Sequence, residues 1–231
     1  DNNGKLPKDV MPAVMKNIAK MEKKTGKKWN STKNPLLVSV RSGAAISMPG
    51  MMDTILNLGL NEKTVEGFAE QTKNPRFSWD SYRRFIQLFG KVVFGVNDEK
   101  FDHVLDDAKE KQGVTDDSKL SVESLKSIVS KYKKICEEHT KRKFPDTPNE
   151  QLVLSIEAVF KSWMGERAIV YREKNNITKD IANGTAVNVV TMVFGNMGDD
   201  SATGVVFTRN GHNGKKEIEG EYLINAQGED V

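Results

Sequence analysis

A charged residue at the end of a β-branched run is the first feature of this sequence that could do chemistry. In "VSVRSGA", Arg41 follows the apolar alternation of a short strand. A guanidinium is always charged, and its fork of N–H donors matches the oxygens of a phosphate. At the end of a strand it would leave the sheet edge for a cleft. By itself, such an arginine is more often a surface ion pair, so its neighbours decide between the two roles.

Those neighbours form a pliable loop between two apolar runs. Ser42-Gly43 and Pro49-Gly50 permit close approach of the backbone, with amide N–H groups free to point at an anion. The combination predicts a loop that folds over phosphates. The sequence has no GxxxxGK[ST] motif and no GxGxxG motif after a strand, so the P-loop and the dinucleotide fingerprint are excluded.

Other residues of this loop have two readings each. Met48, Met51 and Met52 are either core filler or a soft lid that excludes water. Thr54 either donates its hydroxyl to a phosphate or begins the next strand. Asp53 could approach Mg²⁺, but a lone carboxylate is weak support for a metal site.

A later apolar run, "VTMVFGN" at 190–196, also has two readings. It is either a core strand or the apolar wall and backbone edge that an adenine requires. The three histidines show no triad or zinc spacing, so we expect no catalytic histidine. Cys136 lies on the apolar side of a predicted helix, where we expect a buried, inert thiol.

Composition restricts the class of protein. The chain has 231 residues, 37% apolar and 29% charged, which is typical of a globular domain with a substantial core. No apolar run approaches the roughly 20 residues that span a bilayer, so we expect no membrane partner. Residues 1–33 contain nine lysines and three acids, which we interpret as a solvated basic face and not as a nucleic-acid surface.

Hydrophobic periodicity predicts strands, then helices, then strands. The expected helices cover 9–25, 61–71 after an Asn61 cap, a stretch from about Asp80 to Val93, 97–111, 122–136, and 148–165 after a Thr147-Pro148 start. Expected strands lie at 36–40 and 54–60, and three β-rich runs after residue 184 resemble an antiparallel meander. The pattern predicts an α+β protein in which residues 60–175 are almost wholly helical.

The segments "PLLVSVRSGA", "SMPGMMDTILNLGLN", "NPRFSWDSYRRFIQ", "TGVVFTRN" and "GEYLINAQGEDV" closely resemble the N-terminal nucleotide-binding domain of the pyruvate, phosphate dikinases. "GTAVNV-TMVFGN" matches as well, and the blocks cover most of the chain outside 95–150. The resemblance implies an ATP-grasp-like fold with a large helical insertion. It divides the chain into a first lobe with a lead-in helix (1–60), a helical subdomain (61–175) and a truncated adenine-side lobe (176–231).

The resemblance also implies the function and its residues. The family transfers phosphoryl groups from ATP through a phosphohistidine, giving phosphoenolpyruvate, AMP and diphosphate. Arg41 matches the arginine on the nucleotide phosphates, and it is the one residue to which a catalytic role is assigned. Gly50 and Thr54 match positions of the glycine loop that covers the phosphates. The strand that edges the adenine is matched by Thr191, Met192 and Val193.

This sequence departs from the family pattern at two positions. Val190 stands where a glutamine is expected beside the adenine strand, and Ala45 stands where an arginine is expected near the phosphates. We expect the Mg²⁺ ligands and a phosphate-binding lysine to lie outside the chain. The same holds for the phosphohistidine and TIM-barrel domains, so the fragment alone is expected to be inactive.

The parent protein is expected to be a cytoplasmic homodimer, or to lie in an organelle of a eukaryote. Two alternatives stay open. One is a phosphoenolpyruvate synthase fragment, in which water replaces phosphate as acceptor. The other is a non-catalytic nucleotide-binding module.

Overall fold

The structure is a computed structural model that describes residues 4–231. Residues 1–3, which belong to the predicted first lobe (1–60), lie outside the described residues. The chain forms two compact units, Asp1–Met192 and Val193–Val231. The division into 1–60, 61–175 and 176–231 stays a prediction.

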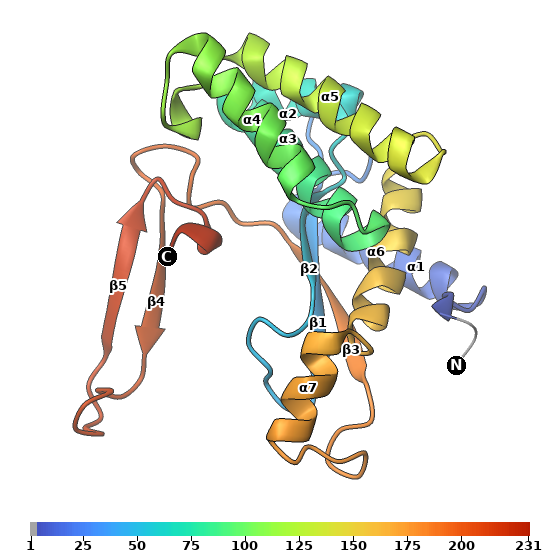
Figure 1. Cartoon of the computed structure of the whole chain (residues 1–231), viewed down its shortest axis with the longest axis vertical. Helices are drawn as coiled ribbons and strands as arrows, with labels where there is room; N and C mark the ends of the chain where they lie inside the picture. Colours follow the sequence, from blue (N-terminus) through green and yellow to red (C-terminus); the bar gives the residue numbers. More distant parts are fainter. Residues whose placement is uncertain (1–3) are drawn as a thin grey trace. The chain divides into compact units, whose positions relative to one another are not determined.

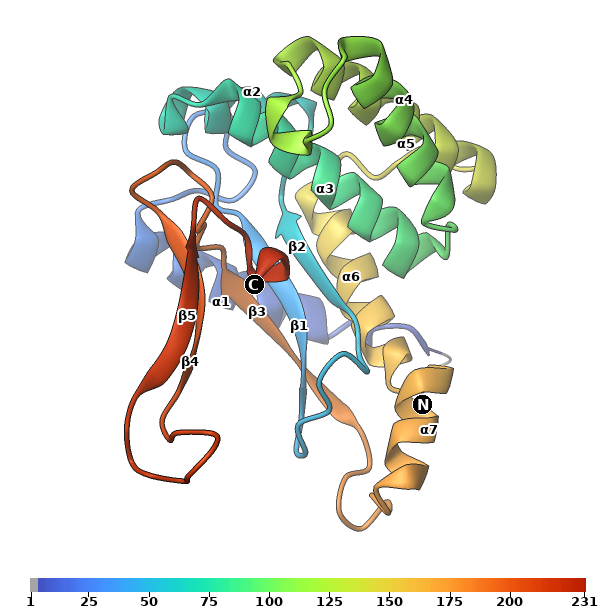
Figure 2. The same cartoon turned by 60° about the vertical axis from the view of Figure 1, so that its left-hand side comes forward.

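The first unit is built on an antiparallel sheet of three strands in the order β2-β1-β3. The strands are β1 (Val38–Ala44), β2 (Thr54–Leu58) and β3 (Thr185–Thr191). β1 and β3, far apart in the sequence, pair along their whole length, from Val38 opposite Thr191 to Ala44 opposite Thr185 (Figure 2). The expected meander of the last three strands is therefore wrong. β3 pairs with β1 because its alternate apolar residues continue the buried face of that strand.

Six helices of this unit lie between β2 and β3 in the sequence. The helices of the unit are α1 (Val10–Thr25), α2 (Glu62–Thr72), α3 (Pro75–Phe94), α4 (Glu99–Gln112), α5 (Val122–Thr140), α6 (Pro148–Ser162) and α7 (Glu166–Lys174), with a short 3₁₀ turn, η2 (Asp117–Lys119). The six helices between β2 and β3 confirm the predicted helical insertion, and together with the sheet they confirm the α+β class.

The helix starts follow from side-chain caps. Asn61 accepts hydrogen bonds from the N–H groups of Lys63 and Thr64, and Thr147 accepts one from Glu150, as the sequence predicts. The helix expected from Asp80 instead begins at Pro75. Asn74 caps it and proline occupies the first turn, where no donor is lost.

Within residues 4–231, α3 and α6 cover one face of the three-stranded sheet. α6 packs against all three strands and α3 packs against β2, and both views show α6 running beside the sheet (Figures 1 and 2). Val38, Val40 and Ile55 are fully buried on that face. The opposite face carries Arg41 and Asn188, both exposed.

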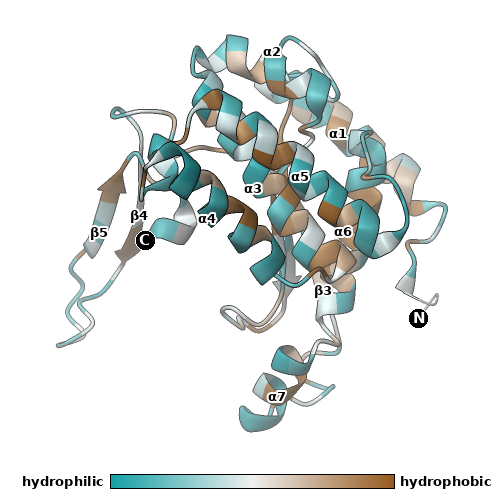
Figure 3. Ribbon diagram, turned by 45° about the horizontal axis from the view of Figure 1, so that its top comes forward, coloured by the Kyte–Doolittle hydropathy of each residue, from teal (hydrophilic) through white to brown (hydrophobic). Residues whose placement is uncertain are grey.

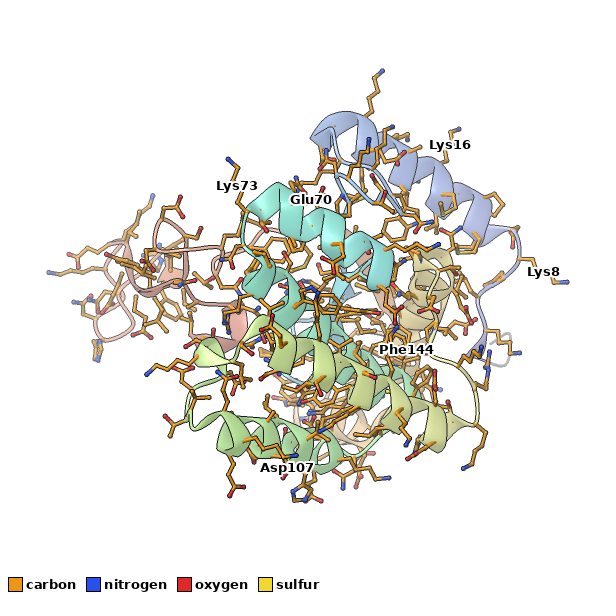
Figure 4. All side chains as sticks on the ribbon, turned by 90° about the horizontal axis from the view of Figure 1, so that it is seen from above. Lys8, Lys16, Glu70, Lys73, Asp107 and Phe144 are labelled. Atoms are coloured by element: carbon orange, nitrogen blue, oxygen red, sulfur yellow. The ribbon has the colours of Figure 1, made fainter. Side chains whose placement is uncertain are left out.

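The helical core is aromatic. Phe144 stacks edge-on against Phe85 and Phe89, and α3 packs against both α5 and α6, which all carry apolar residues (Figure 3). Figure 4 shows Phe144 among the helices, whereas Lys8 and Lys16 point outward from the α1 region. This packing holds α6 in place, and α6 in turn covers one face of the sheet.

The second unit is a hairpin of β4 (Ala202–Phe207) and β5 (Glu219–Ile224), followed by the 3₁₀ turn η3 (Gly228–Asp230). Its strands pair from Ala202 opposite Ile224 to Phe207 opposite Glu219. Gly195 accepts a hydrogen bond from the N–H of Ala226 at 3.0 Å, which closes the open end of the hairpin.

Candidate functional site

Arg41 lies in the middle of β1, and not at its end as the sequence predicts. The apolar run stops at Val40, but the backbone of β1 stays paired with β3 through Ala44. Arg41 is therefore presented on the exposed face of the sheet, with Thr54 of β2 on one side and Asn188 of β3 on the other as cross-strand partners. A cation on a rigid strand is held more firmly than one on a loop.

The guanidinium of Arg41 is braced at one nitrogen and open at the others. Its Nε donates to the hydroxyl of Ser39 at 3.2 Å, and Ser39 is 3% exposed. Within residues 4–231, no carboxylate forms an ion pair with Arg41. An arginine with free terminal nitrogens and no acidic neighbour is a ready partner for an anion.

The loop between β1 and β2 ends in a tight turn over Pro49-Gly50. Met51 N–H donates to Met48 O at 3.2 Å, and Gly50 has a φ of +71°. Proline followed by glycine at positive φ is the signature of a type II turn. Gly50 is exposed, so the tip of the loop can approach a ligand without a side chain in the way.

Of the three loop methionines, the structure assigns only Met48 to the core. Met48 is 5% exposed and belongs to the core, whereas Met51 and Met52 are half-buried. Met48 thus anchors the loop.

Asp53 ties the far end of the loop to the α6–α7 corner. Its N–H donates to the hydroxyl of Ser162 at 3.2 Å, and its carboxylate accepts from Nη2 of Arg167 at 3.3 Å. Burial raises the pKa of this carboxyl, and the charges of Arg167 and Lys91 oppose the rise. A carboxylate that already has a cationic partner is poorly placed to bind Mg²⁺.

No metal site is formed by the residues that the structure describes. Among residues 4–231, no group of three or more histidine, cysteine or acidic side chains could hold a metal ion.

The predicted adenine strand lies further along β3. Thr191, its last residue, pairs with Val38, three residues or about 10 Å along the strand from the level of Arg41. The N–H of Met192 donates to the carbonyl oxygen of Leu37 at 2.9 Å, so this donor already has a partner within the sheet. Because the hydrogen-bonding groups of an antiparallel strand alternate between its two edges, those of Thr191 point to the free edge. Val193 begins the second unit and is 89% exposed.

Asn188 is the residue of this face that the sequence reading missed. A signal existed: in "TAVNVVT" the polar side chain stands between two valines, which is typical of an exposed position on a strand. Val190, on the same face, is 49% exposed, and where the family pattern has glutamine it offers only an apolar contact.

Comparison with known proteins identifies the family of the chain. The family model described as "Pyruvate phosphate dikinase, AMP/ATP-binding domain" matches residues 2–231. The chain belongs to this family. The α+β fold is accordingly the ATP-grasp-like fold expected of a pyruvate, phosphate dikinase nucleotide domain, and the predicted resemblance is confirmed.

Relatives named pyruvate, phosphate dikinase match over nearly the whole chain. The protein of Entamoeba histolytica is 55% identical over 230 residues, and that of Clostridium symbiosum is 53% identical over 232. The chloroplastic pyruvate, phosphate dikinase 1 of Arabidopsis thaliana is 50% identical over 98% of this chain. The chain spans about a quarter of the length of these relatives. In the part of the chain that the structure describes, no helix has the length and hydropathy to cross a bilayer.

Proposed function

We propose that this chain binds ATP, with Arg41 on the phosphates, as part of a pyruvate, phosphate dikinase. That enzyme would pass phosphoryl groups from ATP through a phosphohistidine and yield phosphoenolpyruvate, AMP and diphosphate. Phosphohistidine and TIM-barrel domains of a longer, dimeric parent would be its partners. We assign no Mg²⁺ ligand to this chain.

The observation that supports the proposal is the hydrogen bonding of the Arg41 guanidinium. Its Nε is held by Ser39, its terminal nitrogens have no carboxylate partner among the described residues, and the Pro49-Gly50 turn closes the loop that follows it. Phosphoryl transfer requires fixed positive charge where negative charge builds up, and a braced guanidinium supplies it. The loop would lie against the phosphates through Gly50, with the Thr54 hydroxyl as an additional donor.

The nucleoside end would lie along β3. The free edge at Thr191 offers backbone groups to the adenine, Met192 an apolar wall, and Val193 stays a predicted contact. The order Arg41, Val190, Thr191 along the sheet suits an elongated ligand with a charged and an apolar end.

Titration of ATP into the 231-residue chain by calorimetry tests the proposal. Arg41→Ala is expected to weaken binding about tenfold or more, because a charge-assisted hydrogen bond contributes about 1.5–3 kcal/mol. Arg142→Ala is the matched control, since Arg142 is an exposed arginine on the loop after α5. Binding that is absent, or equal in the two variants, would refute the proposal.

A second assay addresses the reaction. A full-length dikinase that carries this domain is expected to release diphosphate over repeated turnovers only when ATP, phosphate and pyruvate are all present. Activity that does not depend on phosphate would instead indicate a phosphoenolpyruvate synthase.

A further inference from the structure

Asn188 and Arg41 face each other across two strands of the uncovered sheet face. They are Cα partners in the antiparallel register of β1 and β3, so their side chains leave the same face side by side. Asn188 is exposed, and within residues 4–231 its side-chain amide forms no hydrogen bond. Asparagine is also disfavoured in strands, and here it stands between two valines. The exposed face accounts for a polar residue at this position, but asparagine is not the polar residue that a strand favours.

Gly43 makes room for this amide. It lies two residues after Arg41 on β1, hence on the same face, and a Cβ built on it would lie 2.5 Å from Nδ2 of Asn188. Its φ is not among the positive values, so the backbone does not require glycine here. A glycine inside a strand costs stability and commonly marks a close approach by a ligand or another group. The missing side chain leaves room for the amide over β1, on the face that also carries Arg41.

The chemistry of the pair suits an anion. The guanidinium offers its terminal N–H groups and the amide offers two more N–H donors without adding negative charge. The acid nearest to Arg41 in the sequence, Asp53, forms an ion pair with Arg167.

We propose that Asn188 is a further phosphate-binding residue, its Nδ2 donating to the nucleotide beside Arg41 while Gly43 keeps the amide in place. This inference rests on the proposed function, because it assumes that the phosphates lie at Arg41.

The first test compares two substitutions of Asn188 with the wild type, with ATP and adenosine as the probes in calorimetry. Asn188→Ala is expected to weaken ATP binding about tenfold to a hundredfold, in the range of one hydrogen bond to a charged group. Asn188→Asp preserves the size of the side chain but repels phosphate, so it is expected to be weaker again by about tenfold. Adenosine, which lacks phosphates, is expected to bind all three proteins equally.

The second test uses Gly43. Gly43→Ala displaces the amide and is expected to weaken ATP binding to a similar degree, and the double variant with Asn188→Ala is expected to be no weaker than either single one. Gly184→Ala and Asn17→Ala are the controls, since a Cβ on Gly184 meets nothing within 4 Å and Asn17 lies on α1. Thermal unfolding of each variant, followed by circular dichroism, verifies the fold.

The outcomes separate the two proposals. If Arg41→Ala weakens ATP binding but Asn188→Ala and Asn188→Asp do not, the role of Asn188 is refuted and the proposed function stands. If Asn188→Ala weakens ATP and adenosine alike, the residue supports the sheet and not the phosphates. If Arg41→Ala has no effect, both proposals fail.

Discussion

The Nε of Arg41 donates to the hydroxyl of Ser39, two residues earlier on the same strand, at 3.2 Å. Residues at this spacing share a face of a strand, so the small hydroxyl lies under the long side chain. Ser39 is buried at 3% exposure, which fixes the bond in place. The guanidinium is oriented by its own strand and does not depend on a ligand for its position.

Ser39→Ala is therefore expected to weaken ATP binding about threefold to tenfold, because the guanidinium loses one hydrogen bond of about 1 kcal/mol that holds it in the binding orientation. Calorimetry with ATP measures the effect. Ser42→Ala is the control, since Ser42 alternates to the other side of the same strand. Equal affinities of the two variants would show that Arg41 is positioned by something other than Ser39.

A buried ion pair stabilises the start of α3. Nη2 of Arg83 lies 2.7 Å from Asp80, and both side chains are at most 6% exposed. Burial alone would raise the pKa of the Asp80 carboxyl, but the charges of Arg83 and Arg84 outweigh it and lower the pKa. The carboxylate therefore stabilises the fold above its unfolded pKa of 3.8, and this contribution is lost as the pH falls through the lower folded value.

Asp80→Asn is expected to reduce the free energy of unfolding at pH 7 by about 3 kcal/mol, because Arg83 stays buried without its counter-charge. The difference from the wild type should shrink as the pH falls below 3.8. Urea unfolding at a series of pH values measures both effects, with Asp107→Asn on the exposed face of α4 as the control (Figure 4). A constant difference at all pH values would contradict the assigned role of the charge.

Local signals predict much of this fold. Asn61 and Thr147-Pro148 mark helix starts correctly because a cap is decided by a few neighbouring residues. The Pro49-Gly50 turn is predicted for the same reason. Pairing between β1 and β3 is not predicted, since it joins residues about 150 positions apart and the short link to the next β-rich run favours a hairpin.

The site is predicted in part, and the reason is geometric. The type of residue 41 indicates an anion partner, but its place in mid-strand depends on backbone pairing that continues after the apolar side chains end. The neighbours of Arg41 across the sheet, Thr54 and Asn188, depend on register. Only one of the two, Thr54, is close enough in sequence to be considered with it.

Gly67 lies inside α2 at a point of backbone contact. A Cβ on Gly67 would lie 1.9 Å from the carbonyl oxygen of Thr32. Alanine in place of glycine normally stabilises a helix interior by about 1 kcal/mol. Here Gly67→Ala is expected to destabilise the protein by about 1–3 kcal/mol, as overpacking does.

Urea unfolding shows whether Gly67→Ala lowers or raises the free energy of unfolding. Glu70→Ala, on the exposed side of α2, is the control and should stay within about 0.5 kcal/mol of the wild type (Figure 4). A stabilised Gly67→Ala variant would mean that α2 does not press against the loop at Thr32.

Cys136 is predicted to be inert until the helices separate. Burial, with a smaller effect from the charge of Glu137, raises the pKa of its thiol to about 12, and the thiolate is the reactive form. The Sγ also lies against Gly90 of α3, where an added Cβ would be 2.8 Å away. Iodoacetamide should therefore leave the native protein unmodified and label it fully in urea, as mass spectrometry would show.

Ser127→Cys, on the exposed side of α5, is the matched control and should be labelled in the folded protein. Rapid labelling of native Cys136 would show that α3 and α5 part locally without global unfolding.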